Sequence, residues 1–238
     1  MSASPSPQPP PPQPTLVPAT ESSPAHSPAN THPDFSLSSL QQFIADSQDP
    51  QKSKLDPKPT YPPELHHLAL QVAHNIRFQQ EWTDIRVHYR PSARTTAAAL
   101  PRPILSGLPP RRLYVHPDEQ IDVLRQQREQ GKAGWPDLAA EREWVLPTHL
   151  RETWALRRFA EVFDALATVP AEDEGSGLFP APNGARRPQQ SQQSQQQGDD
   201  VSKWRRSQPK RLLLSTVDDD STVVYYIVHD GIVKPRQN

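Results

Sequence analysis

The sequence predicts one mixed α/β domain, a mixed sheet flanked by helices, with a proline-rich tail before it and a glutamine-rich insertion inside it. Thirty of the 238 residues are proline, and sixteen of them precede Glu64, which favours a chain that is part folded and part disordered. Later segments carry apolar residues at helical and at alternating spacing, the two patterns that a mixed fold requires. We therefore expect a disordered tail over 1–58 and a domain over 59–238, with a disordered insertion at 169–209.

The composition excludes several classes of protein. The chain contains no cysteine, which excludes disulfides, thiolate metal sites and a cysteine nucleophile. No apolar run reaches the roughly 18 residues of a transmembrane helix, and the first residues lack a basic region followed by an apolar core, so we expect neither membrane insertion nor a secretory signal. The net charge of −1 gives no general attraction to nucleic acid. RNA binding would therefore need a local basic patch.

One short stretch of the tail differs from the rest. Leu37, Leu40 and Ile44 recur at helical spacing within the segment Phe35–Ile44. This pattern is typical either of a transient helix in a disordered tail or of a short motif that docks on a partner.

The first part of the domain shows both kinds of periodicity. Apolar residues from Leu65 to Ile76 follow the 3.6-residue repeat of an amphipathic helix. Ile85, Val87 and Tyr89 then alternate as in a strand. In order, we expect a helix at about 62–80, a strand at 82–89, a loop at 91–110, a strand at 111–116 and a helix at 118–130 with Ile121 and Leu124 facing inward.

The second part of the domain ends in a predicted hairpin. A short apolar stretch at 144–146 predicts a strand, and Thr148 can cap a helix that runs to about Ala167. The hairpin is expected to have strands at 212–217 and 223–228 and a turn at 218–222. Its second strand is apolar or aromatic throughout, without alternation, so both of its faces must be covered by helices or by another chain.

The sequence carries no motif for a cofactor or a metal ion. It has no glycine-rich phosphate loop and no histidine pair at metal-binding spacing, so we expect no cofactor, no metal and no small-molecule substrate. His116, His149 and Lys210 are conceivable catalytic groups of a metal-independent ribonuclease. Each histidine also stands where a predicted helix begins, next to capping residues, which is the simpler interpretation.

Charged residues gather before the hairpin and in its turn. The basic segment before it includes a tryptophan, and stacking together with phosphate contact is the combination that binds RNA. The residues of possible RNA contact are Lys203, Trp204, Arg205, Arg206, Lys210 and Arg211. A solvated edge of a linker is the alternative. The turn carries three adjacent acids, Asp218–Asp220, and because one would satisfy a turn, three indicate a partner with a basic groove.

Five segments together resemble a known family. They are Tyr61-Pro62, Gln80–Asp84, Leu108–Pro117, Arg142–Pro147 and the hairpin run Arg211–Pro235. In them the chain resembles the small non-catalytic (SEN-fifteen type) subunit of the eukaryotic tRNA-splicing endonuclease, in its fungal form. The resemblance implies a structural subunit of a hetero-tetramer of catalytic and structural subunits that removes introns from precursor tRNA. It also implies a location in the nucleus, or in the cytoplasm on the mitochondrial surface.

The resemblance also implies where such a subunit makes contact. Its last long strand would pair through the main chain with a catalytic subunit, and its acidic turn would dock in a groove of a catalytic subunit from the other dimer. The implied interface residues are Asp218, Asp219, Asp220, Val223, Val224, Tyr225, Tyr226, Ile227 and Val228. No catalytic residue is implied, because the family's glycine-rich segment with its tyrosine and histidine is absent and only Lys210 stands near the position of its lysine. A self-contained ribonuclease and an RNA-binding adaptor are the alternatives.

Overall fold

The computed structural model describes residues 37–48, 61–132, 134–135, 138–180 and 204–233. Its helices are α1 (Ser39–Gln48), α2 (Pro63–Phe78), α3 (Pro117–Glu129) and α4 (Leu156–Ala165). Its strands are β1 (Thr83–His88), β2 (Ile104–Leu108), β3 (Glu143–His149), β4 (Ser176–Gly177), β5 (Arg211–Val217) and β6 (Val223–His229). None of the described helices is long and apolar enough to cross a membrane.

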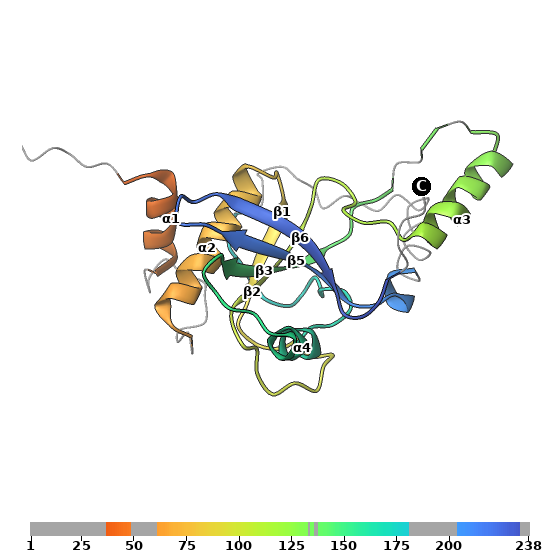
Figure 1. Cartoon of the computed structure of the whole chain (residues 1–238). Coiled ribbons are helices and arrows are strands. Elements are labelled where there is room, and N and C mark those ends of the chain that lie inside the picture. Colours follow the sequence, from red (N-terminus) through yellow and green to blue (C-terminus); the bar gives the residue numbers. More distant parts are fainter. Residues whose placement is uncertain (1–36, 49–60, 133, 136–137, 181–203, 234–238) are drawn as a thin grey trace, which may run out of the picture. The chain divides into compact units, whose positions relative to one another are not determined.

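The six strands form one sheet in the order β4-β1-β2-β3-β5-β6. Figure 1 labels β1, β2, β3, β5 and β6 of this sheet. Strands β3 and β5 run parallel, and the other neighbouring strands are antiparallel. The predicted mixed α/β fold is confirmed.

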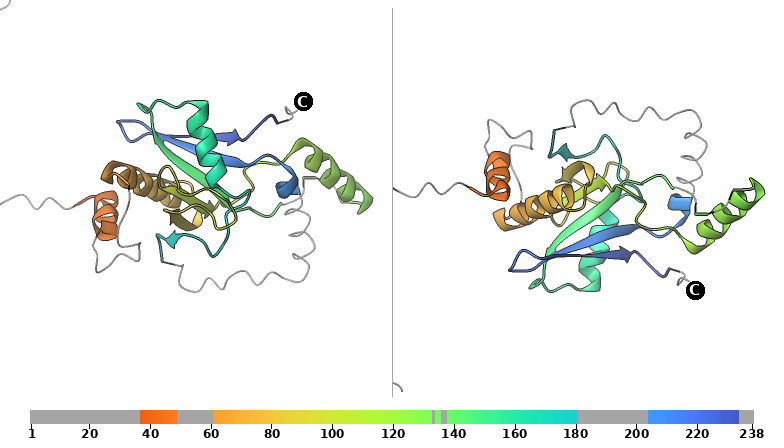
Figure 2. Two further views of the ribbon diagram at one scale, coloured as in Figure 1. Left: turned by 90° about the horizontal axis from the view of Figure 1, so that it is seen from below. Right: turned by 90° about the horizontal axis from the view of Figure 1, so that it is seen from above.

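Helices α2 and α4 cover opposite faces of the sheet (Figure 2). Leu105 and Val145 belong to the core under α2, whereas Ile104, Trp144 and Leu146 belong to the core under α4. Successive side chains of a strand point to opposite faces, so β3 contributes to both cores. Its residues Trp144 to Leu146 are at most 1% exposed, and the neighbouring residues Ile104 to Ser106 of β2 are equally buried, so these two strands form the centre of the core.

The strand predicted at 111–116 is wrong, and the structure has a strand in the preceding segment instead. Strand β2 lies within the expected loop and pairs with both β1 and β3. The prolines around it suggested a loop, but none of them lies inside the strand itself. Residues 111–116 form irregular backbone, which carries the side chain of Arg112 into the interior.

Two further predictions need correction, namely the residue at which α4 begins and the residues that α3 buries. Helix α4 begins at Leu156 rather than after Thr148, because Thr148 extends β3 and its hydroxyl donates to the carbonyl of Ser215 at 3.1 Å. Helix α3 agrees with the predicted segment 118–130, but Ile121 is 54% exposed rather than inward-facing. The buried residue of α3 is the charged Glu119.

Part of the predicted disordered tail packs on the domain. Helix α1 lies within 1–58 and contacts α2. A capping box begins it, in which the Gln41 N–H donates to Ser38 Oγ (3.2 Å) and the Ser38 N–H donates to Gln41 Oε1 (2.9 Å). Within this tail, residues 39–48 are therefore helical and contact their own chain. The rest of the tail, 1–36 and 49–58, lies outside the described residues.

Both ends of the predicted insertion 169–209 carry secondary structure. Near its beginning, β4 pairs with β1, and the Leu178 N–H donates to the carbonyl of Ile85 at 3.1 Å. Near its end, residues 204–207 form a helical turn that leads into β5. The intervening residues 181–203 lie outside the described part of the chain.

Candidate protein interface

Strand β6 forms one edge of the sheet. Its inner side pairs with β5 over its whole length, from Val217↔Val223 to Arg211↔His229. Its outer side pairs with no strand in the part of the chain that the structure describes. An open edge of this length is a surface to which another chain can add a strand.

Alternate residues of β6 direct their main chain to the open edge. At the two ends of the hairpin, the Asp218 N–H donates to the Thr222 carbonyl (2.9 Å) and the Asp230 N–H donates to the Lys210 carbonyl (2.8 Å). Because hydrogen-bonded pairs alternate along an antiparallel ladder, the even-numbered residues of β6 bond to β5. The residues whose main-chain groups point to the open edge are Val223, Tyr225, Ile227 and, at the end of the strand, His229.

The helices of the chain cover the two faces of β6 only in part. Tyr225 points toward α2, where its hydroxyl donates to Asn75 Oδ1 at 2.5 Å, and burial raises the pKa of this tyrosine. On the opposite face Val224 and Tyr226 are 43% and 59% exposed. Ile227, on the face of Tyr225, is 39% exposed. Exposed apolar side chains therefore remain on both faces of the sheet next to the open edge.

The acidic turn is shaped by two of its own carboxylates. Asp218 Oδ1 accepts from the Asp219 N–H at 2.7 Å, and Asp220 Oδ1 accepts from the Thr222 N–H at 2.8 Å. Hydrogen bonds from Thr222 hold the pKa of Asp220 below its usual value. The expectation that one acid satisfies the turn is therefore incomplete, because two of the three accept main-chain hydrogen bonds within it.

The third acid, Asp219, ties the turn to the segment that follows β3. Its carboxylate pairs with Arg151, and its Oδ1 lies 3.3 Å from Nε2 of His149. The side chains of Asp219 and Arg151 are 50% and 76% exposed. An ion pair this exposed contributes little to folding, so Asp219 is available to a competing cation.

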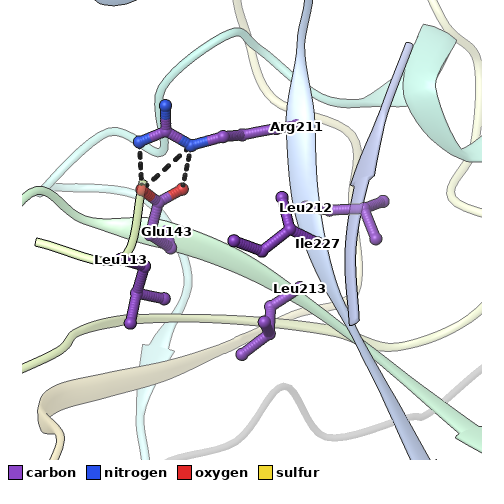
Figure 3. A pocket seen from close by; sticks show the side chains of 6 residues that line it. All are labelled: Leu113, Glu143, Arg211, Leu212, Leu213 and Ile227. Atoms are coloured by element: carbon purple, nitrogen blue, oxygen red, sulfur yellow. Dashed lines mark hydrogen bonds and ion pairs between the residues drawn. The ribbon is translucent and has the colours of Figure 1, made fainter. Parts of the chain in front are cut away.

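The two buried arginines of the basic segment are not available to RNA. Arg205 and Arg211 are 1% and 3% exposed. Both contact Glu143 on β3, Arg205 through its Nη2 at 2.9 Å from Oε2 and Arg211 through Nε and Nη2. Figure 3 shows the guanidinium of Arg211 facing the carboxylate of Glu143. Neither arginine forms part of the surface.

These contacts belong to a buried ionic cluster, whose members are Arg112, Glu119, Glu141, Glu143, Arg205 and Arg211. Arg112 Nη2 lies 2.9 Å from the carboxylates of both Glu119 and Glu141, and Arg211 contacts Glu141 at the same distance. Burial raises the pKa of Glu141 and lowers that of Arg205 to about 10. The cluster joins the first turn of α3 to the starts of β3 and β5, and sequence reasoning missed it.

The other described members of the predicted RNA-contact set do not form a basic surface either. Trp204 is half-buried and stacks against His116 with ring centroids 6.3 Å apart. Lys210 donates to a carbonyl near the end of α4 at 2.7 Å. Arg206 is exposed, and Lys203 lies outside the described residues. The set is therefore corrected: most of its described cations serve contacts within the domain.

The three candidate catalytic residues are not brought together. His149 is in register with Val217 at one end of β5, and Lys210 immediately precedes the other end. A seven-residue strand spans about 20 Å, too far for a shared site. His116 caps α3, and its Nδ1 accepts from the Asp118 N–H at 3.2 Å. Among the described residues no group of three His, Asp or Glu side chains is placed to hold a metal ion.

The fold and the open apolar edge define an α/β domain suited to pairing with a further strand. The family model described as "Sen15 protein" matches residues 71–238, and the chain belongs to this family. Over 112 residues the chain is 43% identical to the "Probable tRNA-splicing endonuclease subunit tsp-1" of Neurospora crassa. That match covers 46% of this chain and 45% of the relative, so the chain matches less than half the length of that protein. The resemblance seen in the sequence is confirmed at the level of the family.

Proposed function

We propose that this chain is a subunit of a tRNA-splicing endonuclease and that it pairs with a catalytic subunit through the open edge of β6. The observation that carries the proposal is the edge strand itself, which combines an unpaired main chain with exposed apolar side chains. Membership of the Sen15 family and the name of the Neurospora relative support the choice of complex.

Strand addition at β6 would supply both affinity and specificity. The main-chain groups of Val223, Tyr225 and Ile227 offer hydrogen bonds to any strand laid along the edge. Specificity would come from the side chains that flank that edge, above all the exposed Val224 and Tyr226. Pairing would also remove an exposed edge that invites aggregation.

The role proposed for the chain in the complex is structural. His149 and Lys210 lie at opposite ends of β5, so the three candidates cannot form one site, and a lone lysine cannot act as base, acid and charge stabiliser together. Recognition of precursor tRNA and cleavage of its introns would then belong to the hetero-tetramer, in the nucleus or on the mitochondrial surface. The acidic turn would provide a second contact, with a basic groove of a catalytic subunit from the other dimer, and Asp219 is exposed enough to make it.

The test is co-expression of the full chain with its endonuclease partners. Ile227→Pro removes an N–H that points to the open edge, whereas Ile227→Ala removes the side chain and keeps that N–H. We expect Ile227→Pro to abolish co-purification with the catalytic subunit and Ile227→Ala to weaken it only slightly. Val228→Pro, which removes a donor to β5, shows what loss of the fold looks like in a melting experiment.

The outcomes separate the alternatives. Normal assembly of a folded Ile227→Pro variant would contradict pairing through β6. Metal-free cleavage of precursor tRNA by the purified chain alone would identify a self-contained ribonuclease. Tight binding of that RNA without cleavage and without partners would identify an adaptor.

A further inference from the structure

Helix α1 covers a face of α2 that the sheet does not reach. Its half-buried residues Leu40, Phe43, Ile44 and Ser47 recur at helical spacing, and its remaining positions are mainly exposed. On α2, Leu70 is completely buried although it belongs to neither core cluster of the sheet. Leu70 stands one helical turn before His74, which contacts Phe43 of α1, so the two residues lie on the same side of α2.

Four aromatic rings form the contact between α1, α2 and the segment after β4. We call these rings the aromatic clamp; they are Phe43, His74, Phe78 and Phe179. Phe43 stacks on Phe179 with centroids 4.8 Å apart and an angle of 8° between the rings, and it lies 5.9 Å from His74. Phe179 also meets the ring of Phe78 edge-on at 5.8 Å. Stacked and edge-on pairs of this kind stabilise a contact by about 0.5–1.5 kcal/mol beyond their burial.

The clamp lies at the edge of the sheet opposite to β6. Strand β4 has two residues, so it protects little of β1 by itself. Phe179 stands two residues after β4 and is held between Phe43 of α1 and Phe78 of α2. Helix α1 therefore contacts the segment that follows β4, at the edge of the described sheet opposite to β6.

The contact has the properties of a docked peptide. A ten-residue helix is marginal in water even with a good cap, so α1 depends on its contacts with α2 and Phe179 for stability. Over residues 39–47 of α1, whose burial is described, no residue is fully buried, and Phe78 remains 61% exposed with α1 in place. Covalent linkage to α2 supplies an effective concentration that can reach roughly the millimolar range, which keeps a weak contact occupied.

We propose that Leu70, His74, Phe78 and Phe179 line a docking groove for a short amphipathic helix, and that α1 occupies it as an exchangeable cover that closes the β1 edge. The groove recognises the side chains of Leu40, Phe43 and Ile44. A peptide with the same pattern binds there in trans once α1 is displaced.

The experiment uses the full chain and a fluorescent peptide of residues 37–48. Phe43→Ala in the protein removes the central ring of the clamp and vacates the groove. We expect the peptide to bind this variant at least tenfold more tightly than the wild type, whose groove is filled by its own α1. Gln42→Ala is the matched control, because Gln42 is an exposed residue of the same helix, and it should behave as the wild type. A peptide carrying Phe43→Ala should not bind either protein.

Hydrogen exchange on the wild-type chain provides a second measurement that needs no variant. The amides of residues 43–48 should exchange at least tenfold more slowly in the full chain than in the free peptide. Equal exchange in the two would overturn the proposal, as would equal peptide affinity for the wild type and a folded Phe43→Ala protein.

Discussion

Glu143 and Arg211 stand opposite each other at the first positions of two parallel strands, and both are buried. Strands β3 and β5 are in register from Val145↔Leu213 onward, and the ion pair lies two residues before that point. Their side chains are 4% and 3% exposed. The carboxylate of Glu143 also contacts Arg205, so one acid lies against two buried guanidinium groups, of which Arg211 also contacts Glu141. The charge balance of the buried ionic cluster therefore depends on Glu143.

Replacement of Glu143 should therefore be costly. Glu143→Gln keeps the shape of the side chain but removes the negative charge that lies between the buried Arg205 and Arg211. Loss of one partner of a buried ion pair typically costs about 3–5 kcal/mol of folding free energy. Urea denaturation of the full chain measures the loss. Glu161→Gln is the control, because its pair with Arg157 is exposed and is expected to contribute less than about 1 kcal/mol. Equal losses in the two variants would contradict the account of the cluster.

Stability should also fall in mild acid because of a buried histidine. Burial lowers the pKa of His88 to about 4, with further lowering from Arg142 and Arg86. The unfolded chain takes up a proton near pH 6.5, whereas folded His88 stays neutral until about pH 4. The contribution of His88 is thus complete above pH 6.5 and is lost as the pH falls toward 4, by about 3 kcal/mol in all.

The pH dependence is isolated by comparing variants. His88→Gln can keep a hydrogen bond to Ser106, which His88 now makes at 2.9 Å, but it cannot titrate. We expect the free energy of unfolding to depend less on pH between 6.5 and 4 in His88→Gln than in the wild type. An unchanged slope in His88→Gln would show that His88 is charged in the folded protein.

The local periodicity of the sequence predicts several elements well. The apolar repeat in α2 and the alternation in β1 come from neighbours in the chain, and the hairpin follows from two apolar runs around an acidic turn. Strand β2 was missed because the prolines on either side of it dominate its local signal. The buried cluster could not be predicted, since Arg205 and Arg211 are separated from Glu143 by 62 and 68 positions. Without that pairing, a run of arginines next to a tryptophan has the pattern of an RNA-binding surface.

Gly175 should tolerate no side chain. A Cβ at this position would lie 2.6 Å from the ring of buried His88, and the residue has a φ of +82°. Gly175→Ala therefore combines backbone strain with a steric clash, and we expect a loss of stability of about 2–4 kcal/mol. Gly131→Ala is the matched control, because its φ is +67° and its Cβ would meet no atom within 4 Å. A melting temperature that falls equally in both variants would mean that the ring of His88 can move aside.

Removal of the three charges of the acidic turn should weaken assembly and spare the fold. In the triple variant Asp218→Asn, Asp219→Asn and Asp220→Asn, the amide oxygens can still accept the main-chain hydrogen bonds of the turn. The lost pair between Asp219 and Arg151 is exposed, so the melting temperature of the isolated chain should change by no more than a few degrees. Desolvated acids in a basic groove typically contribute about 2–5 kcal/mol to association, so the hetero-tetramer should dissociate at moderate salt.

Size-exclusion chromatography of the co-expressed complex measures this loss, and cleavage of precursor tRNA should fall with it. The control carries the same change of net charge at exposed sites away from the turn, through Asp122→Asn, Glu129→Gln and Glu161→Gln. It should assemble normally, because its substitutions leave the turn intact. If the turn variant and the control elute together as intact tetramers with normal cleavage, the three aspartates serve only the turn and its contact with Arg151.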